Sequence, residues 1–151
     1  MSDVDNISFN SNGQLIPGIY TLCWLEFFSL YSYNPKRKRL LRGLYYGIIE
    51  LKKAGATEIF VDGSFVTQKV EPNDFDACWN LQGVDLKLLD PIFLDFRDGR
   101  KAQKARFGGE FFPHNWSAIA GTGLTFLEFF QKDKFTGDPK GIIRIDLRTF
   151  T

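Results

Sequence analysis

Residues 62–76 read DGSFVTQKVEPNDFD, and this stretch determines how the rest of the chain is interpreted. It follows the run EIFVD at residues 58–62, which has the β-branched and aromatic composition of a short buried strand. The Gly63-Ser64 pair at the end of that run predicts a tight turn. Residues 75–79 predict a second strand, so the stretch is interpreted as strand, turn, connection and strand.

Two helices are expected before this stretch. Residues 1–19 are predicted to be an irregular lead-in, and residues 20–151 a single domain, since about 100–150 residues commonly share one core. Apolar residues recur at roughly helical spacing over residues 21–31. Residues 35–53 predict the longest helix, with Asn34 as its N-cap and a proline in its first turn.

Further elements are expected after the second strand. Residues 86–107 are broken by Pro91 and Gly99 and predict two short helices. The remaining segments predict a strand at 110–112, a helix at 124–130 and a strand at 142–147. This order of elements predicts an α/β (α+β) fold, with a short mixed sheet flanked by helices. The expected aromatic core on the side away from the active cleft comprises Phe111, Phe112, Phe126, Phe129 and Phe130.

Composition restricts the class of protein. Hydrophobic residues make up 44% of the 151 residues and aromatic residues 16%, which is ample for a folded core. The net charge of +1 argues against a surface designed as a whole for nucleic acid or for anionic membranes. Cys23 and Cys78 are far apart and predict neither a disulfide framework nor a zinc site. The apolar runs are too short to span a bilayer, so a cytoplasmic protein without membrane contact is expected.

Asp74 and Asp76 are the residues that point most directly to chemistry. Because side chains alternate along a strand, the two carboxylates are expected on one face. Nucleotidyl transfer uses two divalent cations held by carboxylates, together with donors for the phosphate tail. A turn such as Gly63-Ser64 can supply backbone N–H groups and a hydroxyl for that tail. A purely structural alternative is that these residues serve only the turn and the exposed strand.

The stretch 62–76 resembles the strand, Gly-Ser turn and Asp-x-Asp signature of the DNA polymerase beta-like nucleotidyltransferase superfamily. More closely, residues 20–147 are similar to a family of small bacterial nucleotidyltransferase-like proteins of the minimal type. The additional marks are the aromatic stretch at residues 26–28, RFGGEFFP at residues 106–113 and EFFQKDKFTGDPKGIIRI at residues 128–145.

The resemblance implies roles for individual residues. Gly63 and Ser64 are expected to hold the β- and γ-phosphates of an NTP, and Asp74 and Asp76 to bind Mg²⁺ or Mn²⁺. The third acid of the superfamily falls on Glu110 and would help to deprotonate the attacking hydroxyl. Three alternatives stay open for that acid: Asp95, Asp146, or a site that lacks it and binds nucleotide without transfer.

Several neighbouring residues have weaker assignments. Thr67 and Lys69 are expected to line the same loop, with Lys69 either neutralising phosphate or exposed to solvent. Lys104 and Arg106 either reach the triphosphate or lie on a solvated helix face. Further expectations are a capping role for Asp62 and a loop position without a catalytic partner for His114. The basic run at residues 36–42 is expected to be either a solvated face or a patch that binds RNA, DNA or polyphosphate.

The expected activity is metal-dependent transfer of a nucleoside monophosphate from an NTP, such as ATP, to a hydroxyl of a protein, an RNA or a small molecule. A short chain has little room for an acceptor domain, so a protein partner or self-association is expected to complete the acceptor site. The second hypothesis, also by resemblance, is a toxin-antitoxin or phage-defence interaction protein. Its partner would be encoded nearby, and its nucleotide site would be regulatory or vestigial.

Overall fold

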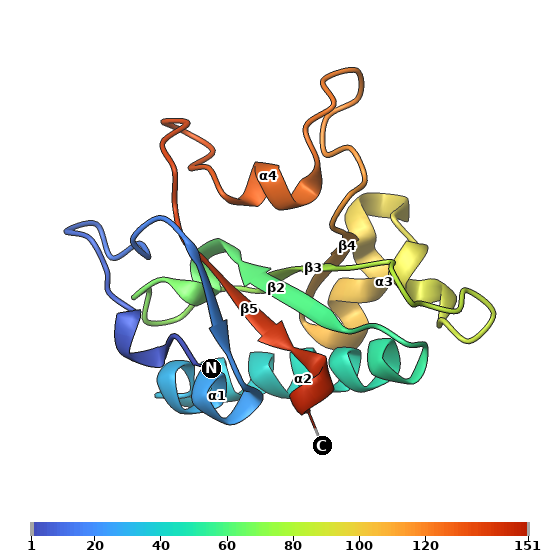
Figure 1. Ribbon diagram of the computed structural model, residues 1–151, viewed down its shortest axis with the longest axis horizontal. Helices are drawn as coiled ribbons and strands as arrows, with labels where there is room; N and C mark the ends of the chain where they lie inside the picture. Colours follow the sequence, from blue (N-terminus) through green and yellow to red (C-terminus); the bar gives the residue numbers. More distant parts are fainter. Residues whose placement is uncertain (1, 151) are drawn as a thin grey trace.

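A mixed sheet forms the centre of the molecule (Figure 1). The computed structural model describes residues 2–150, which contain four α-helices and a five-stranded sheet. The strand order is β1 (Ile19–Leu22), β5 (Ile142–Asp146), β2 (Glu58–Asp62), β3 (Phe75–Trp79) and β4 (Gly109–Pro113). The pairs β1–β5 and β3–β4 are parallel, whereas β2 is antiparallel to both β5 and β3. The predicted α/β fold with a mixed sheet is confirmed.

Two helices, α1 (Trp24–Tyr31) and α2 (Pro35–Lys53), lie below the sheet in Figure 1. Helix α2 has the predicted bounds, and the Asn34 side chain accepts a hydrogen bond from the Arg37 backbone N–H at 2.8 Å, as an N-cap should. Its apolar stripe belongs to the main core together with Ile59, Val61 and Ala77, which are fully buried. The larger core therefore lies between α2 and this face of the sheet.

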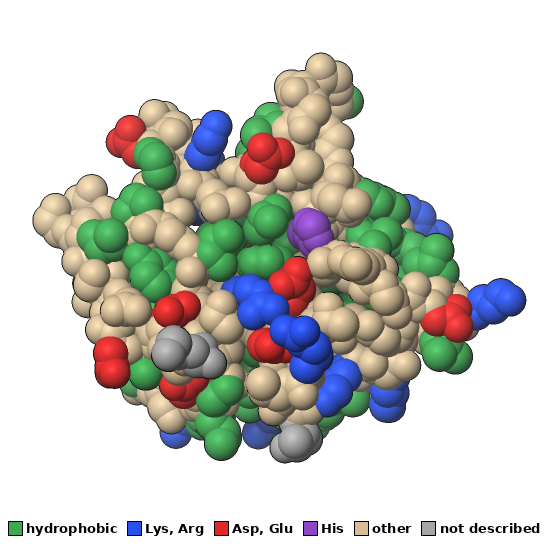
Figure 2. All heavy atoms as spheres, in the orientation of Figure 1, with side chains coloured by type: hydrophobic (Ala, Val, Ile, Leu, Met, Phe, Trp, Pro, Cys, Tyr) green, Lys and Arg blue, Asp and Glu red, His purple; other side chains and the backbone are tan. Residues whose placement is uncertain are grey.

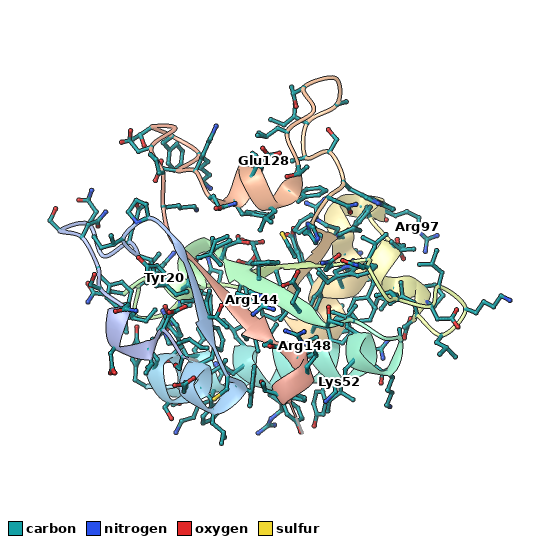
Figure 3. The ribbon with its side chains drawn as sticks, viewed as in Figure 1. Tyr20, Lys52, Arg97, Glu128, Arg144 and Arg148 are labelled. Carbon is teal, nitrogen blue, oxygen red and sulfur yellow. The ribbon has the colours of Figure 1, made fainter. Side chains whose placement is uncertain are left out.

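The short helix α4 (Phe126–Phe130) lies on the other side of the sheet. Figure 3 shows this layering, because Glu128 on α4 and Lys52 on α2 lie on opposite sides of the strand that carries Arg144. A second, smaller core fills the space below α4 and is formed by four buried residues, Phe60, Cys78, Phe112 and Ile142, with partly buried Phe96, Phe126, Leu127 and Phe130 packed against them.

The expected aromatic core is divided between the two faces of the sheet. Phe111 belongs to the main core, whereas Phe112 stacks on Phe126 with ring centroids 4.4 Å apart. Consecutive residues of a strand point to opposite faces, so Phe111 and Phe112 cannot share one core. Phe129 belongs to neither cluster and contributes to the wall of a cleft that is described below.

The region between β3 and β4 contains the two expected short helices. The 3-10 helix η3 spans Pro91–Leu94, and α3 spans Arg97–Phe107. Helix α3 is interrupted at residues 98–100, where all three φ angles are positive. The remaining 3-10 helices are η1 (Val4–Asn6), η2 (Gly63–Val66) and η4 (Leu147–Thr149).

The N-terminal part of the chain differs from expectation at one strand. Residues 21 and 22 were predicted to begin a helix but belong to β1, because the backbone of residues 19–22 pairs with β5. The irregular segment before β1 packs onto the domain, since Leu15 is buried in the main core. Among the helices within residues 2–150, none combines the length and the apolar character that crossing a membrane requires.

Close contact between α2 and α3 depends on Gly43, because a Cβ at this position would overlap the backbone carbonyl of Phe107. We predict that Gly43→Ala lowers the free energy of unfolding by about 1–3 kcal/mol, although alanine is the better helix former by about 1 kcal/mol. Urea denaturation followed by circular dichroism measures this change. Arg39→Ala, an exposed substitution on the same helix, should change the stability by less than about 0.5 kcal/mol. Equal stability of Gly43→Ala and the unsubstituted protein would contradict the packing argument.

Candidate functional site

A cleft of about 640 Å³ opens where β2 ends and β3 begins. One wall is the loop that follows β2, and the other is formed by α4 and the segment after it. Six of the residues predicted for the site line this cleft: Gly63, Ser64, Thr67, Lys69, Asp74 and Asp76. The structure therefore brings together both halves of the signature that the sequence suggested.

The acidic residues form a row across three strands. Asp62 on β2 is directly opposite Asp76 on β3, and Asp76 is beside Glu110 on β4. Each of these acids is two residues from a member of the smaller core, so alternation places all three on the face of the sheet that α4 covers. Asp74, two residues before Asp76, extends the row to the start of β3.

Asp62 has an unusual environment. Its side chain is fully buried, and neither carboxylate oxygen has a hydrogen-bond partner among the described residues. The predicted capping role is wrong, because the Asp62 side chain makes no capping hydrogen bond to the turn. Alternation along β2 could have indicated its position, since Phe60 and Asp62 share a face. A buried carboxylate without a partner is costly and requires a proton or a cation.

Burial and mutual repulsion raise the pKa values of the acids. Burial contributes most to the raised pKa of Asp76, which reaches about 7, and the charges of Asp74 and Glu110 add to it. The pKa of Asp62 lies well above its usual range, first because of burial and then because of Asp76. Burial and then Glu110 raise the pKa of Asp74. The row therefore has a strong tendency to take up positive charge.

Gly63 is required by the shape of this site. Its φ of +76° lies in the left-handed region that glycine adopts at little cost. A Cβ built on Gly63 would lie 2.5 Å from Oδ2 of Asp76, so any other residue would push the carboxylate away. The glycine of the motif thus allows the turn and also allows Asp76 to pack closely against the backbone.

Arg37 holds the loop after β2 from the side of the main core. It belongs to the basic run that was expected to be a solvated face or a binding patch, but its side chain is fully buried. Nη1 donates to the carbonyl of Phe65 at 2.7 Å, and Nη2 donates to the carbonyls of Thr67 and Lys69. The guanidinium also lies over the rings of Tyr33 and Phe65. The Arg37 guanidinium therefore fixes the loop that lines the cleft through hydrogen bonds to the backbone carbonyl groups of the loop.

Thr67 and Lys69 have different positions in this loop. The Thr67 hydroxyl donates to the carbonyl of Ser64 at 2.6 Å and accepts from the Lys69 N–H at 3.1 Å. Thr67 therefore braces the turn while also lining the cleft. Lys69 is exposed at the rim, and its charge acts to lower the pKa of Asp74. Lys69 is thus exposed to solvent, as one of its two expectations had it, while its side chain also lines the cleft.

Glu110 is close to the row but is already paired. Arg100 Nε lies 2.7 Å from its Oε2 and Lys104 Nζ lies 2.9 Å from its Oε1. Glu110 is buried, and it is not among the residues that line the cleft. Arg106 instead pairs with Asp90 at 2.6 Å, outside the cleft.

The alternative candidates for the third acid lie elsewhere. Asp95 is bound by Arg97 at 2.9 Å, and Asp146 is bound by Arg148 at 3.0 Å. Neither acid lines the cleft. His114 does not line it either; this single histidine lies on the surface in Figure 2, with acidic and basic side chains below it. Its ring is 6.1 Å from that of Phe60, as befits a loop residue packed on the sheet.

The row can be tested for its fit to a divalent cation. Among residues 2–150, no three His, Cys, Asp or Glu side chains are gathered closely enough to enclose a metal ion as they stand. The two unpartnered oxygens of Asp62 and the neighbouring carboxylate of Asp76 nevertheless supply the hard oxygen ligands that Mg²⁺ and Mn²⁺ prefer. The residues that fit a cation are Asp74 and Asp76, which line the cleft, and Asp62, which pairs with Asp76 but is fully buried and does not line the cleft itself. Glu110 is held back by Arg100 and Lys104.

Sequence reasoning did not identify the second wall of the cleft. This wall includes Lys132, Lys134, Phe135 and Lys140, all in the segment between α4 and β5. Residues 12–14 of the N-terminal segment also line the cleft. Local patterns could not reveal these residues, because they reach the cleft only through the packing of segments far apart in the chain.

The buried carboxylate of Asp62 should weaken the fold when no cation is present. We predict that Asp62→Asn raises the free energy of unfolding in EDTA by about 1–3 kcal/mol at about pH 8. The folded protein holds the Asp62 proton more tightly than the unfolded chain. The carboxylate therefore destabilises the fold increasingly as pH rises above the unfolded pKa, and the effect of Asp62→Asn should be small at about pH 4.5. Denaturation curves at both pH values measure this. An effect of the same size at both values would contradict the assigned cause.

Comparison with known proteins gives a family and no assigned activity. No curated protein and no solved structure matches the chain. A family model described as a family of unknown function, DUF6932, matches residues 7–146 and so includes every residue of the acidic row and both walls of the cleft. The chain therefore belongs to the DUF6932 family of unknown function.

Proposed function

We propose that the protein is a metal-dependent nucleotidyltransferase that moves a nucleoside monophosphate from an NTP to a hydroxyl acceptor. The observation that carries the proposal is the cleft in which Asp74 and Asp76 lie with Gly63 and Ser64, next to the unpartnered carboxylate of Asp62. A turn for phosphates and a row of oxygen ligands are the two parts that this chemistry needs in one place.

A bound Mg²⁺ or Mn²⁺ would supply positive charge for the phosphates and for the charge that develops during transfer. Asp62, Asp74 and Asp76 are the residues that would hold it. The acceptor oxygen forms a bond to the α-phosphorus, the bond from that phosphorus to the β-phosphate oxygen breaks, and pyrophosphate leaves. The hydroxyl proton passes to a carboxylate of the row that is free to accept it.

The Gly63–Val66 turn is suited to hold the phosphate tail in place. Its carbonyl groups and those that follow are bound from behind by Arg37, Tyr31 and Thr67. The loop is therefore set before a ligand arrives, which reduces the ordering cost of binding. Lys69 at its rim adds a positive charge on the same side of the cleft.

One observation favours a second function. Glu110, the acid expected to take part in proton transfer, is bound to both Arg100 and Lys104 and does not line the cleft. With Glu110 so held, the cleft suits binding of nucleotide and cation without transfer. The protein would then be an interaction protein of the toxin-antitoxin or phage-defence type, with a regulatory or vestigial nucleotide site and a partner encoded nearby.

Incubation with Mn²⁺ or Mg²⁺, each α-labelled NTP and cell lysate tests the proposed transfer. We predict label transfer to an acceptor that disappears with EDTA. It should fall by about 100-fold or more in Asp74→Asn and Asp76→Asn, because each loses a carboxylate that contributes several kcal/mol to the transition state. Gel autoradiography measures the transferred label.

Asp95→Asn is the matched control, since this acid lies outside the cleft and should leave the transfer unchanged. Nucleotide binding by the unsubstituted protein without transfer, together with a tight complex with a neighbouring gene product, favours the second function. Transfer that persists in Asp76→Asn would falsify the proposed role of the row.

A further inference from the structure

The wall of the cleft that faces the acidic row has no part in the chemistry described so far. It is formed by Phe129 and Phe130 at the end of α4, and by residues 132–135 and Lys140 in the segment that joins α4 to β5. This segment stands above the sheet in Figure 1, on the side of α4. The wall lines the cleft with three phenylalanine rings, of which Phe135 lies beyond α4, and with three lysines.

Phe135 is the most exposed large hydrophobic residue among those described, with 87% of its surface accessible. The ring therefore gains almost nothing from burial in the fold. Lys134 Nζ lies 5.0 Å from the centre of this ring, so a cation accompanies it at the cleft. A flat, accessible ring at the edge of a polar cleft is suited to stack on another flat group.

The turn that carries Phe135 is fixed by Asp133. One oxygen of this carboxylate accepts from the Phe135 N–H at 2.8 Å and the Thr136 N–H at 3.0 Å, and the other accepts from Gln14 Nε2 at 2.8 Å. Gly137 N–H also donates to the Asp133 carbonyl at 2.8 Å. The ring is thus presented by a closed turn that is tied to the N-terminal segment.

Four lysines surround the same cleft: Lys69, Lys132, Lys134 and Lys140. Within residues 2–150, none of their ammonium groups forms an ion pair. Asp133 already accepts three hydrogen bonds, which leaves Asp74 and Asp76 as the acids that face these lysines across the cleft. Unpaired ammonium groups of this kind suit the oxygens of a polyphosphate chain.

We infer that Phe135 is the stacking platform for the base of a nucleoside triphosphate whose phosphates are bound by Lys132 and Lys140. The inference rests on the proposed function and deepens it, because it states which residues contact the base of the nucleotide and which contact its phosphates. The base lies against the wall after α4, and the phosphate chain crosses the cleft toward Ser64 and the acidic row. Stacking contacts only the flat face of the base, which all bases share, so different bases are expected to bind.

The test separates the base from the phosphates by comparing ATP with inorganic tripolyphosphate, both titrated in the presence of Mn²⁺ by isothermal calorimetry. We predict that Phe135→Ala weakens ATP binding by about tenfold, since loss of one base stack is worth about 1–3 kcal/mol, and leaves tripolyphosphate binding unchanged. Phe135→Trp should retain ATP affinity. Lys132→Gln and Lys140→Gln should weaken both ligands.

Leu25→Ala is the matched control, because Leu25 is also exposed but lies on α1, outside the cleft. The inference is overturned if Phe135→Ala weakens ATP and tripolyphosphate equally, or weakens neither, while ATP still binds and label is still transferred. Conversely, binding of ATP that depends on Phe135 without any label transfer supports the inference and contradicts the proposed transfer. Absence of binding by both ligands overturns the inference as well as the nucleotide site.

Discussion

The antiparallel register of β2 and β3 is the constraint on which the site depends. It sets Asp62 directly across from Asp76, and the parallel pairing of β3 with β4 adds Glu110 beside them. Carboxylates brought together in this way repel one another and lose water, which is why the pKa values of Asp62 and Asp76 are raised. A shift of one residue in the β2–β3 register would place Asp62 and Asp76 on opposite faces of the sheet. The same register brings the Asp76 carboxylate against Gly63, where a Cβ would force that side chain to move.

The two cores have different relations to the cleft. The main core, between α2 and the sheet, holds the loop after β2 through the buried guanidinium of Arg37 and gives the first wall its fixed shape. The smaller core, built on Phe60, Phe112 and Phe126, supports α4 and thereby the start of the second wall. The first wall is therefore firmly supported, whereas the second wall ends in an exposed segment. A ligand bound in the cleft can bridge the two walls. The proposed nucleotide would bring negative phosphates to the lysines, and the cation bound to those phosphates would bring positive charge to the acids.

Membership of a family of unknown function leaves the activity to be argued from the site itself. The third acid distinguishes the two functions proposed above. Glu110 occupies the expected position in the row, yet its charge is compensated by Arg100 and Lys104 from α3, a helix whose first turn has three residues with positive φ. Asp62 has no hydrogen-bond or ion-pair partner within residues 2–150, with only the charge of Lys140 acting to lower its pKa, and is the acid with the greater need for a cation.

The sequence by itself determined the α/β class, the bounds of α2, β2 and β3, and the placement of Asp74 and Asp76 on one face, because these features depend on local periodicity, capping and turn residues. It did not reveal strand β1, which exists only through its pairing with β5, or the division of Phe111 and Phe112 between two cores. The buried state of Arg37, the unpartnered carboxylate of Asp62 and the wall that carries Phe135 were decided by tertiary structure alone. The physical reason is that burial, ion pairing and the lining of a cleft are set by contacts between residues far apart in the chain. The sequence pattern of any one segment does not indicate such contacts.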